Sequence, residues 1–211
     1  MKRVAILMPV LLGGCITLLP KPPPPPRIFV LEARDVQQLQ GVPVDAVVAV
    51  ATPGGERALL GSDLVWRTGD SIAFVAQSEW SNRAADALQQ VLAETLTRQG
   101  RFRASTRSGE ARADYEIRWE VLDFEVREED MKAHFVADVR LVTQGRNIVA
   151  SRIISAEADV SDRSSSIAAQ ALARAAREGS ARIGEFAADA AAQAEASAGA
   201  SDRASAASIN R

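Results

Sequence analysis

The chain has 211 residues, of which 47% are hydrophobic and 25% are charged, and its 25 basic and 27 acidic residues leave a net charge of −2. This length suffices for one well-packed core with tails. The near balance of charge gives no sign of the strongly basic surface that nucleic-acid binding uses, so we expect no nucleic-acid partner.

The first 15 residues have the pattern of a bacterial lipoprotein signal. Two basic residues precede the apolar run Val4–Leu12, which is too short to cross a bilayer, since spanning requires about 20 residues. The run ends in the lipobox-like Leu12-Gly13-Gly14-Cys15. We therefore expect residues 1–14 to be a cleaved signal peptide and the thiol of Cys15 to carry the membrane lipid anchor. An ordinary signal peptide with an incidental cysteine is the alternative.

A proline-rich tether follows, over residues 15–27. It contains Pro20 and the unbroken run Pro22–Pro26, which favours an extended polyproline II conformation. Such a segment would hold a folded domain, residues 28–192, roughly 30–40 Å from the bilayer surface. An unstructured spacer and a proline-rich motif for a partner protein are the alternatives.

Apolar runs predict the first strands of the domain. Ile28–Leu31 is short, and Ala46–Ala51 is so uniformly apolar that we expect a central strand covered on both faces. Asp63–Trp66 and Ser71–Ala76 flank Thr68-Gly69-Asp70, whose turn chemistry predicts a hairpin.

The strongest periodic signal predicts a helix over residues 79–99. Ser78 or Ser81 could cap its first turn, and Gly100 supplies the left-handed conformation that ends it. The apolar positions recur at helical spacing: Trp80, Ala84, Ala87, Leu88, Val91, Leu92 and Leu96.

A three-stranded antiparallel meander is expected next. After the strand Phe102–Thr106, residues 115–126 alternate, but the apolar phase slips after Val121, which indicates a β-bulge. Strands around Phe135–Leu141 and Ile148–Val160 would complete the meander.

A final alanine-rich helix is predicted from Ser161-Asp162 to about Ala192, followed by an Ala/Ser-rich tail, residues 193–211, expected to be disordered. The elements together predict an α/β (α+β) fold in which a mixed, mainly antiparallel sheet is packed by two helices, with flexible tails.

The search for catalytic chemistry is mostly negative. His134 is the only histidine, and a structural place on a strand face is favoured over a catalytic one. No second histidine or free cysteine is present to complete a zinc site, and no phosphate-binding or nucleophile motif occurs. We expect no catalytic residues, no metal and no cofactor. Four acidic residues, expected to form a solvated turn, are Glu125, Glu128, Glu129 and Asp130.

The tryptophans Trp66, Trp80 and Trp119 each lie within an apolar pattern, so packing in a core or interface is expected. Trp66 differs because its hairpin also carries Phe74 and Val75. If these side chains face outward, the hairpin is an interaction surface. Trp66 and Phe74 are therefore our candidate partner-binding residues.

In its order of motifs the chain resembles the ABC-type transport auxiliary lipoproteins, the family that includes the PqiC-like proteins. The shared features are the lipobox, the short strand Ile28–Leu31, the apolar second strand, the block Leu60–Arg67 and the helix pattern Trp80–Leu96. The resemblance covers roughly residues 15–186. It implies an α+β domain that works beside an ABC permease and ATPase and an MCE-domain protein, a system that moves lipids between the inner and outer membranes.

The resemblance also implies docking and positioning rather than catalysis. Ile16 follows Cys15 where aspartate would favour retention in the inner membrane, so we expect the periplasmic face of the outer membrane. Without disulfides the domain must rely on core packing or on assembly with other chains, and a homo-oligomer is left open. A regulator of peptidoglycan synthesis is the alternative function, because such lipoproteins also join a proline-rich tether to a small α/β domain.

Overall fold

The computed structural model describes residues 24–209, and for residues 201–209 the backbone alone. Cys15, the signal peptide and most of the tether therefore lie outside the described residues. The strands are β1 (Arg27–Phe29), β2 (Val44–Val50), β3 (Gly54–Gly55), β4 (Asp63–Thr68), β5 (Ser71–Trp80), β6 (Phe102–Arg107), β7 (Tyr115–Arg127), β8 (Lys132–Thr143) and β9 (Ile148–Asp159), and the helices are α1 (Ala84–Gln99) and α2 (Ser165–Ile209).

All nine described strands belong to one sheet, and β7 organises it. One side of β7 pairs with the antiparallel β8 from Tyr115 to Arg127. Its other side is shared by three shorter parallel strands, β2, β3 and β4, which meet it one after another. The longest pairings, β7 with β8 and β8 with β9, are antiparallel. The expected meander, and the mixed, mainly antiparallel sheet, are confirmed.

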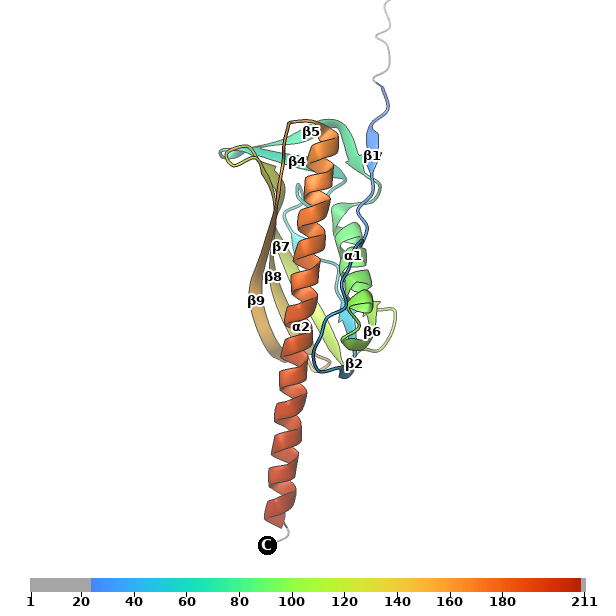
Figure 1. Cartoon of the computed structure of the whole chain (residues 1–211), viewed down its shortest axis with the longest axis vertical. Coiled ribbons are helices and arrows are strands. Elements are labelled where there is room, and N and C mark those ends of the chain that lie inside the picture. The colour runs from blue at the N-terminus through green and yellow to red at the C-terminus, as the bar shows by residue number, and fades with distance from the viewer. Residues whose placement is uncertain (1–23, 210–211) are drawn as a thin grey trace, which may run out of the picture.

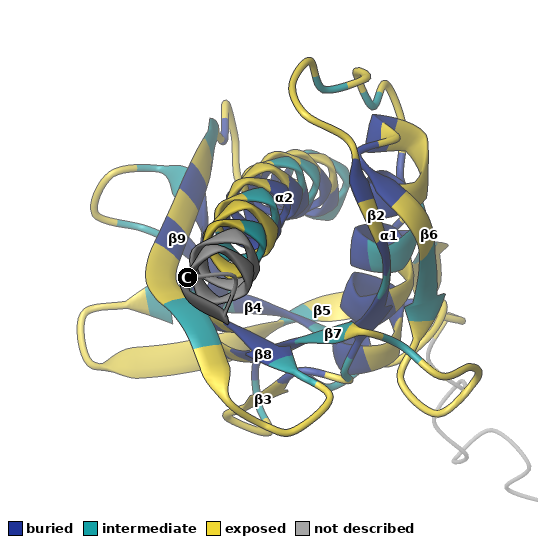
Figure 2. Cartoon of the chain, turned by 90° about the horizontal axis from the view of Figure 1, so that it is seen from below, coloured by how far each residue is buried: buried dark blue, intermediate teal, exposed yellow. Residues whose placement is uncertain are grey.

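The two helices lie side by side on one face of the sheet (Figure 1). Seen along α2, the sheet curves around both helices (Figure 2). β2 lies between β6 and β7, as expected of a central strand, and its Val48 and Val50 are fully buried. Burial of such apolar side chains is the main force that holds the layers together.

Helix α1 begins five residues later than the sequence predicted. β1 pairs with the end of β5, which keeps residues 78–80, including Trp80, in a strand. Arg83 precedes the helix and makes no side-chain cap. The first amide groups of α1 are instead satisfied by backbone carbonyls: Ala84 donates to Gly61 at 2.7 Å and Ala85 to Leu60 at 3.4 Å. A serine cap was therefore unnecessary, and the prediction of Ser78 or Ser81 in that role is wrong.

Other local predictions are confirmed. Gly100 ends α1 with a φ of 71°, and its amide donates to the carbonyl of Leu96. The hairpin turn falls at Gly69, with a φ of 55°, where glycine avoids the steric cost of other residues. The pairing of β7 with β8 shifts register between Val121 and Asp123, at the predicted bulge.

Helix α2 is longer than expected. It begins at Ser165 and continues to Ile209, past Ala192 and beyond the sheet (Figure 1). Alanine has the highest helix propensity, so an alanine-rich segment continues a helix without packing partners. Residues 193–209 are thus helical where the sequence predicted a disordered tail. No described helix has the length and apolarity needed to cross a membrane.

Candidate functional site

The β4–β5 hairpin presents the candidate residues Trp66 and Phe74. Its register places Val65 opposite Phe74 and Trp66 opposite Ala73. Beyond the residues that pair with β1, β5 pairs with β4 alone. Because β4 also pairs with β7 at Trp66 and Arg67, β5 is the edge strand of the sheet here. We call this outer part of the hairpin, residues 65–75, the ribbon; it lies at the end of the molecule where α2 begins (Figure 1).

The ribbon carries exposed apolar side chains. Phe74 is 54% exposed and Ile72 is 37% exposed, whereas Trp66 and Val75 are half-buried. The structure thus places Phe74 on an accessible surface, whereas Trp66 lies on the opposite face of the hairpin, so the two candidate residues do not share one surface. Adjacent exposed apolar side chains are characteristic of surfaces that bind other proteins.

The turn end of the ribbon is held by polar side chains from the end of β7 and the turn after it. Trp66 donates its indole N–H to Glu128 at 3.1 Å, and Thr68 donates its hydroxyl to the same carboxylate oxygen at 3.0 Å. The amide of Gly69 donates to Glu129, and this hydrogen bond lowers the pKa of the Glu129 carboxyl. These contacts fix the ribbon relative to the sheet.

Glu125 is the buried member of this acidic segment, and the expectation of a solvated turn is wrong for it. Its side chain is fully buried, with one carboxylate oxygen 2.6 Å from Nε of Arg67 and 3.3 Å from Nε of Arg127. The hydrogen bond that Arg67 donates to Glu125 raises the pKa of the guanidinium. A buried carboxylate requires such partners because desolvation of an unpaired charge is costly.

His134 lies on β8, buried as a strand-face residue, with Nε2 at 2.8 Å from Asp130 and Nδ1 at 3.6 Å from Glu157. Desolvation acts to raise the pKa of the Asp130 carboxyl, but the hydrogen bonds and charges of His134 and Lys132 together outweigh it, and the pKa is lowered. Trp80 and Trp119 are core residues, as predicted, and the Trp80 ring stacks on Phe124 with centroids 5.9 Å apart.

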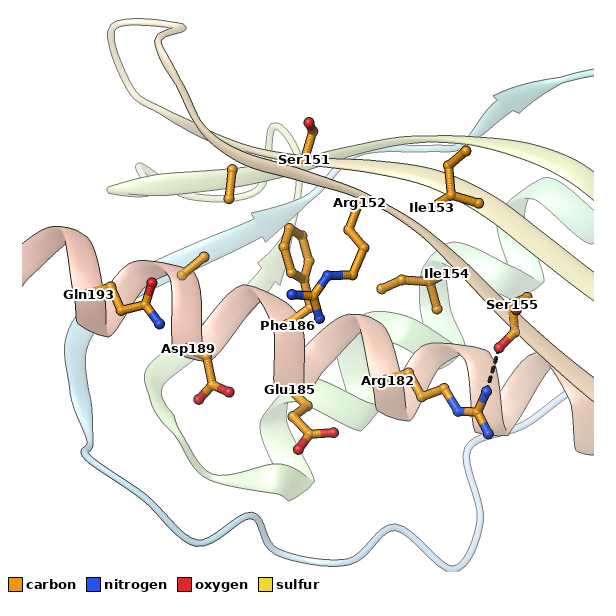
Figure 3. Close-up of a pocket in the computed structure, with 12 residues that line it drawn as sticks. Ser151, Arg152, Ile153, Ile154, Ser155, Arg182, Glu185, Phe186, Asp189 and Gln193 are labelled. Atoms are coloured by element: carbon orange, nitrogen blue, oxygen red, sulfur yellow. Dashed lines mark hydrogen bonds between the residues drawn. The ribbon is translucent and has the colours of Figure 1, made fainter.

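A groove of about 670 Å³ lies between β9 and α2 (Figure 3). Arg152 lies 4.9 Å from the centroid of the Phe186 ring, and Arg182 donates to the backbone carbonyl of Ser155 at 2.6 Å (Figure 3). Arg182 also pairs with Glu178, and Asp189 pairs with Arg101. The charges in the groove are thus largely paired within the protein, so it does not favour a ligand of either sign.

No group of three or more His, Cys, Asp or Glu in the described part of the chain is arranged to hold a metal ion.

The fold is that of an α+β domain with an exposed apolar hairpin at one end. A model of the family described as the ABC-type transport auxiliary lipoprotein component matches residues 29–184, so the chain belongs to that family. Membership makes the protein a lipoprotein of the cell envelope associated with ABC-type transport, and the resemblance found in the sequence is confirmed. No curated protein matches the chain.

Solved structures agree on the fold. Protein XCC0632 from Xanthomonas campestris, described as a DUF330 protein, has a TM-score of 0.74 at 20% identity, covering 80% of this chain and 98% of its own. An uncharacterized protein has a TM-score of 0.62 at 16% identity, covering 77% and 98% respectively. A PelC dodecamer from Paraburkholderia phytofirmans has a TM-score of only 0.39 at 16% identity, covering 69% and 95%, which is too low for any inference.

Proposed function

We propose that this protein is an accessory lipoprotein of an ABC/MCE-type intermembrane lipid transport system, anchored by acylated Cys15 on the periplasmic face of the outer membrane. The observation that carries the proposal is the family match over residues 29–184, which follows directly on a lipobox and a proline-rich tether. The protein acts by docking an MCE-domain partner and the permease–ATPase complex, without catalysing a reaction.

The apolar ribbon supports docking as the mode of action. Phe74 and Ile72 are exposed on it, and polar contacts from Glu128 and Glu129 hold its turn end in place. A rigid, exposed apolar surface loses little conformational entropy when a partner covers it. β1, where the tether enters the domain, lies at the same end of the molecule (Figure 1). The ribbon would therefore face the membrane-proximal part of a partner complex.

The test is crosslinking in intact envelopes followed by affinity purification of the full-length protein. We expect an MCE-domain protein and the transporter subunits to be recovered, and deletion of the gene to weaken the outer-membrane barrier to detergents. Phe74→Ala should reduce partner recovery several-fold. Ile153→Ala is the matched control, because Ile153 is 66% exposed on β9, away from the ribbon.

Recovery of peptidoglycan synthases in place of transporter subunits would support the alternative function. An intact barrier together with no crosslinked transport partner would overturn the proposal. Equal losses for Phe74→Ala and Ile153→Ala would remove the ribbon as the docking surface.

A further inference from the structure

A small cleft of about 220 Å³ lies between β1, the end of β5 and the first half of α2. Its lining combines two kinds of side chain. Phe29, Val30 and Trp80 form an apolar wall, and three arginines, Arg34, Arg174 and Arg177, face the same space. No aspartate or glutamate lines the cleft among the residues that the structure describes.

The three guanidinium groups differ in how they are paired. Arg34 is exposed and forms an ion pair with Glu32 at 2.9 Å. Arg174 donates to the backbone carbonyl of Asp159 at 2.9 Å, which leaves its charge uncompensated. Arg177 is half-buried and makes no hydrogen bond or ion pair with any residue in the described range. The three arginines also line a neighbouring groove whose carboxylates include Asp35, Asp159 and Glu178, but none of those carboxylates lines this cleft. The charged side chains that line the cleft are therefore all positive.

The surroundings of Arg177 disfavour its own charge. Desolvation by burial is the main cause that lowers the pKa of its guanidinium. The positive charge of Arg34 lowers the pKa further, and the opposing effect of Asp35 is smaller than that of Arg34. A bound anion would relieve both effects, because it would give the half-buried cation the partner that the protein does not provide.

The apolar wall restricts the kind of anion. Val30 is 54% exposed and Phe29 is half-buried, so both offer apolar surface beside the guanidinium groups. The volume is below the range of about 300–1,000 Å³ that is typical of pockets for whole drug-sized ligands. It can hold a compact anionic group and the first atoms of an apolar chain, but not a complete lipid.

The position of the cleft also favours a lipid. β1 forms one wall, and the chain runs from β1 towards Cys15. About 12 residues separate Arg27 from Cys15, and an extended chain of that length spans at most about 40 Å. A membrane anchor at Cys15 would therefore keep the cleft within about 40 Å of the bilayer, on the part of the domain where the tether enters.

We propose that this cleft binds the phosphate of an anionic lipid headgroup. The guanidinium groups of Arg177 and Arg174 contact the phosphate oxygens, with Arg34 at the rim, and the start of an acyl chain lies against Phe29 and Val30. Arginine suits this role because its planar donors match phosphate geometry and its charge persists at all physiological pH values. The proposal goes beyond the proposed function, which requires docking surfaces but no ligand site.

The test uses the full acylated protein in a non-ionic detergent and three probes. Dihexanoyl phosphatidic acid carries phosphate and short acyl chains, inorganic phosphate carries the anion alone, and dihexanoylglycerol carries the chains alone. Binding is followed by tryptophan fluorescence, to which Trp80 in the cleft wall contributes, and by the rise in melting temperature. We expect dihexanoyl phosphatidic acid to bind at least tenfold more tightly than either other probe.

Arg177→Gln should weaken the binding of dihexanoyl phosphatidic acid about tenfold, the range expected for loss of one charged hydrogen-bond donor. The variant should melt no lower than the wild type, because it removes a cation without a partner. Arg182→Gln is the control: it removes the same charge from the same helix outside this cleft, and it should leave the affinity unchanged.

Equal affinities of the wild type and Arg177→Gln would overturn the proposal. Inorganic phosphate binding as tightly as dihexanoyl phosphatidic acid would exclude the lipid and indicate a free-anion site. Dihexanoylglycerol binding equally well would show that the arginines contribute nothing. None of these results would change the recovery of transport partners, so failure here is distinguishable from failure of the proposed function.

Discussion

At the scale of single residues, Glu125 connects the strand that organises the sheet to the exposed ribbon. It is fully buried on β7, and its partner Arg67 lies on β4, one of the two strands of the ribbon. Arg127, on β7 itself, shares the same carboxylate oxygen. The other oxygen, Oε2, is buried without a hydrogen-bond partner among the described residues. The local structure therefore depends on one charge between two arginines.

We predict that Glu125→Gln lowers the free energy of unfolding by about 1–3 kcal/mol. Breaking a buried ion pair typically costs about 3–5 kcal/mol, but both arginines here keep partial contact with solvent, which reduces the penalty. Urea denaturation followed by circular dichroism measures the change. Glu120→Gln is the control, since Glu120 is an exposed residue of the same strand, and it should change stability by less than about 0.5 kcal/mol. Equal effects of the two substitutions would contradict the assignment.

The burial of Glu125 could not be predicted from the sequence alone. Glu125 lies in an acidic stretch that continues to Asp130, and such stretches are usually solvated. The bulge after Val121, which the sequence did predict, changes which residues of β7 face each side. Beyond it, Phe124, Glu125 and Val126 are all buried, because β4 covers this end of the strand. Only the tertiary pairing of β4 with β7 reveals the partner Arg67.

At the scale of elements, α2 packs closely against the sheet. Gly179 of α2 lies against the ring of Phe135 on β8, and a Cβ at that position would be 2.2 Å from Cδ1 of the ring. A glycine inside a helix normally costs about 1 kcal/mol relative to alanine. Here it allows α2 to approach the sheet, and the alanines on the same face, including Ala175 and Ala176, are fully buried.

We predict that Gly179→Ala destabilises the protein by about 1–2 kcal/mol. The overpacking penalty of about 1–3 kcal/mol outweighs the gain in helix propensity. Gly199→Ala is a matched control on the same helix, because a Cβ there meets nothing within 4 Å, and it should leave stability unchanged or slightly raised. The melting temperatures of the two variants, measured in parallel by thermal unfolding and compared with that of the wild type, test this prediction. A stabilised Gly179→Ala variant would mean that α2 does not pack this closely.

The two ends of α1 show which element boundaries a sequence pattern can predict. Gly100 ends α1 as predicted, because the signal is local: a glycine with a left-handed φ needs no distant partner. The start of α1 was predicted too early, because Trp80 fits the helical spacing equally well. β1, some fifty residues earlier in the chain, pairs with Trp80 and keeps it in a strand. The cleft beside β1 was not predicted for the same reason, since Arg34 and Arg177 come together only through the fold.

At the scale of the whole molecule, the surface carries several carboxylates whose pKa values lie below their usual range. The hydrogen bond from Lys132 lowers the pKa of Glu157, and hydrogen bonds from Ser164 lower that of Asp162. The pKa values of Glu129 and Asp130 are lowered too. A carboxylate with a lowered folded pKa stabilises the protein above its unfolded pKa, and this contribution is lost as the pH falls through the folded value.

We predict that the free energy of unfolding changes little between pH 7 and pH 5.5 and falls steadily below about pH 4.5, near the unfolded pKa of these groups. Urea midpoints measured from pH 7 to pH 3 give the profile. Glu157→Gln should make the acid slope shallower, because one of the carboxylates that must be protonated is missing. A variant whose profile parallels that of the wild type would rule out a contribution from the Lys132–Glu157 pair.

Also at the scale of the whole molecule, we expect the lipid anchor at Cys15 to be independent of the stability of the folded domain. Pro24, Pro25 and Pro26, the described part of the tether, are exposed and without regular structure. The folded domain therefore has no contact there that lipidation would change. We predict that Cys15→Ser abolishes incorporation of radiolabelled palmitate in growing cells, because we propose that lipid attachment begins at this thiol. The melting temperature of the domain should be unchanged.

The palmitate label and the melting temperature distinguish membrane anchoring at Cys15 from a contribution of the tether to the stability of the domain. Loss of label with an unchanged melting temperature is the expected result, and it places the lipid on Cys15 and the stability in the domain. The full-length Cys15→Ser chain should also migrate differently from the wild type on gels, because the lipoprotein signal is cut only before a lipidated cysteine. Retention of label in the variant would show that the lipid is attached elsewhere and that the tether does not begin at Cys15.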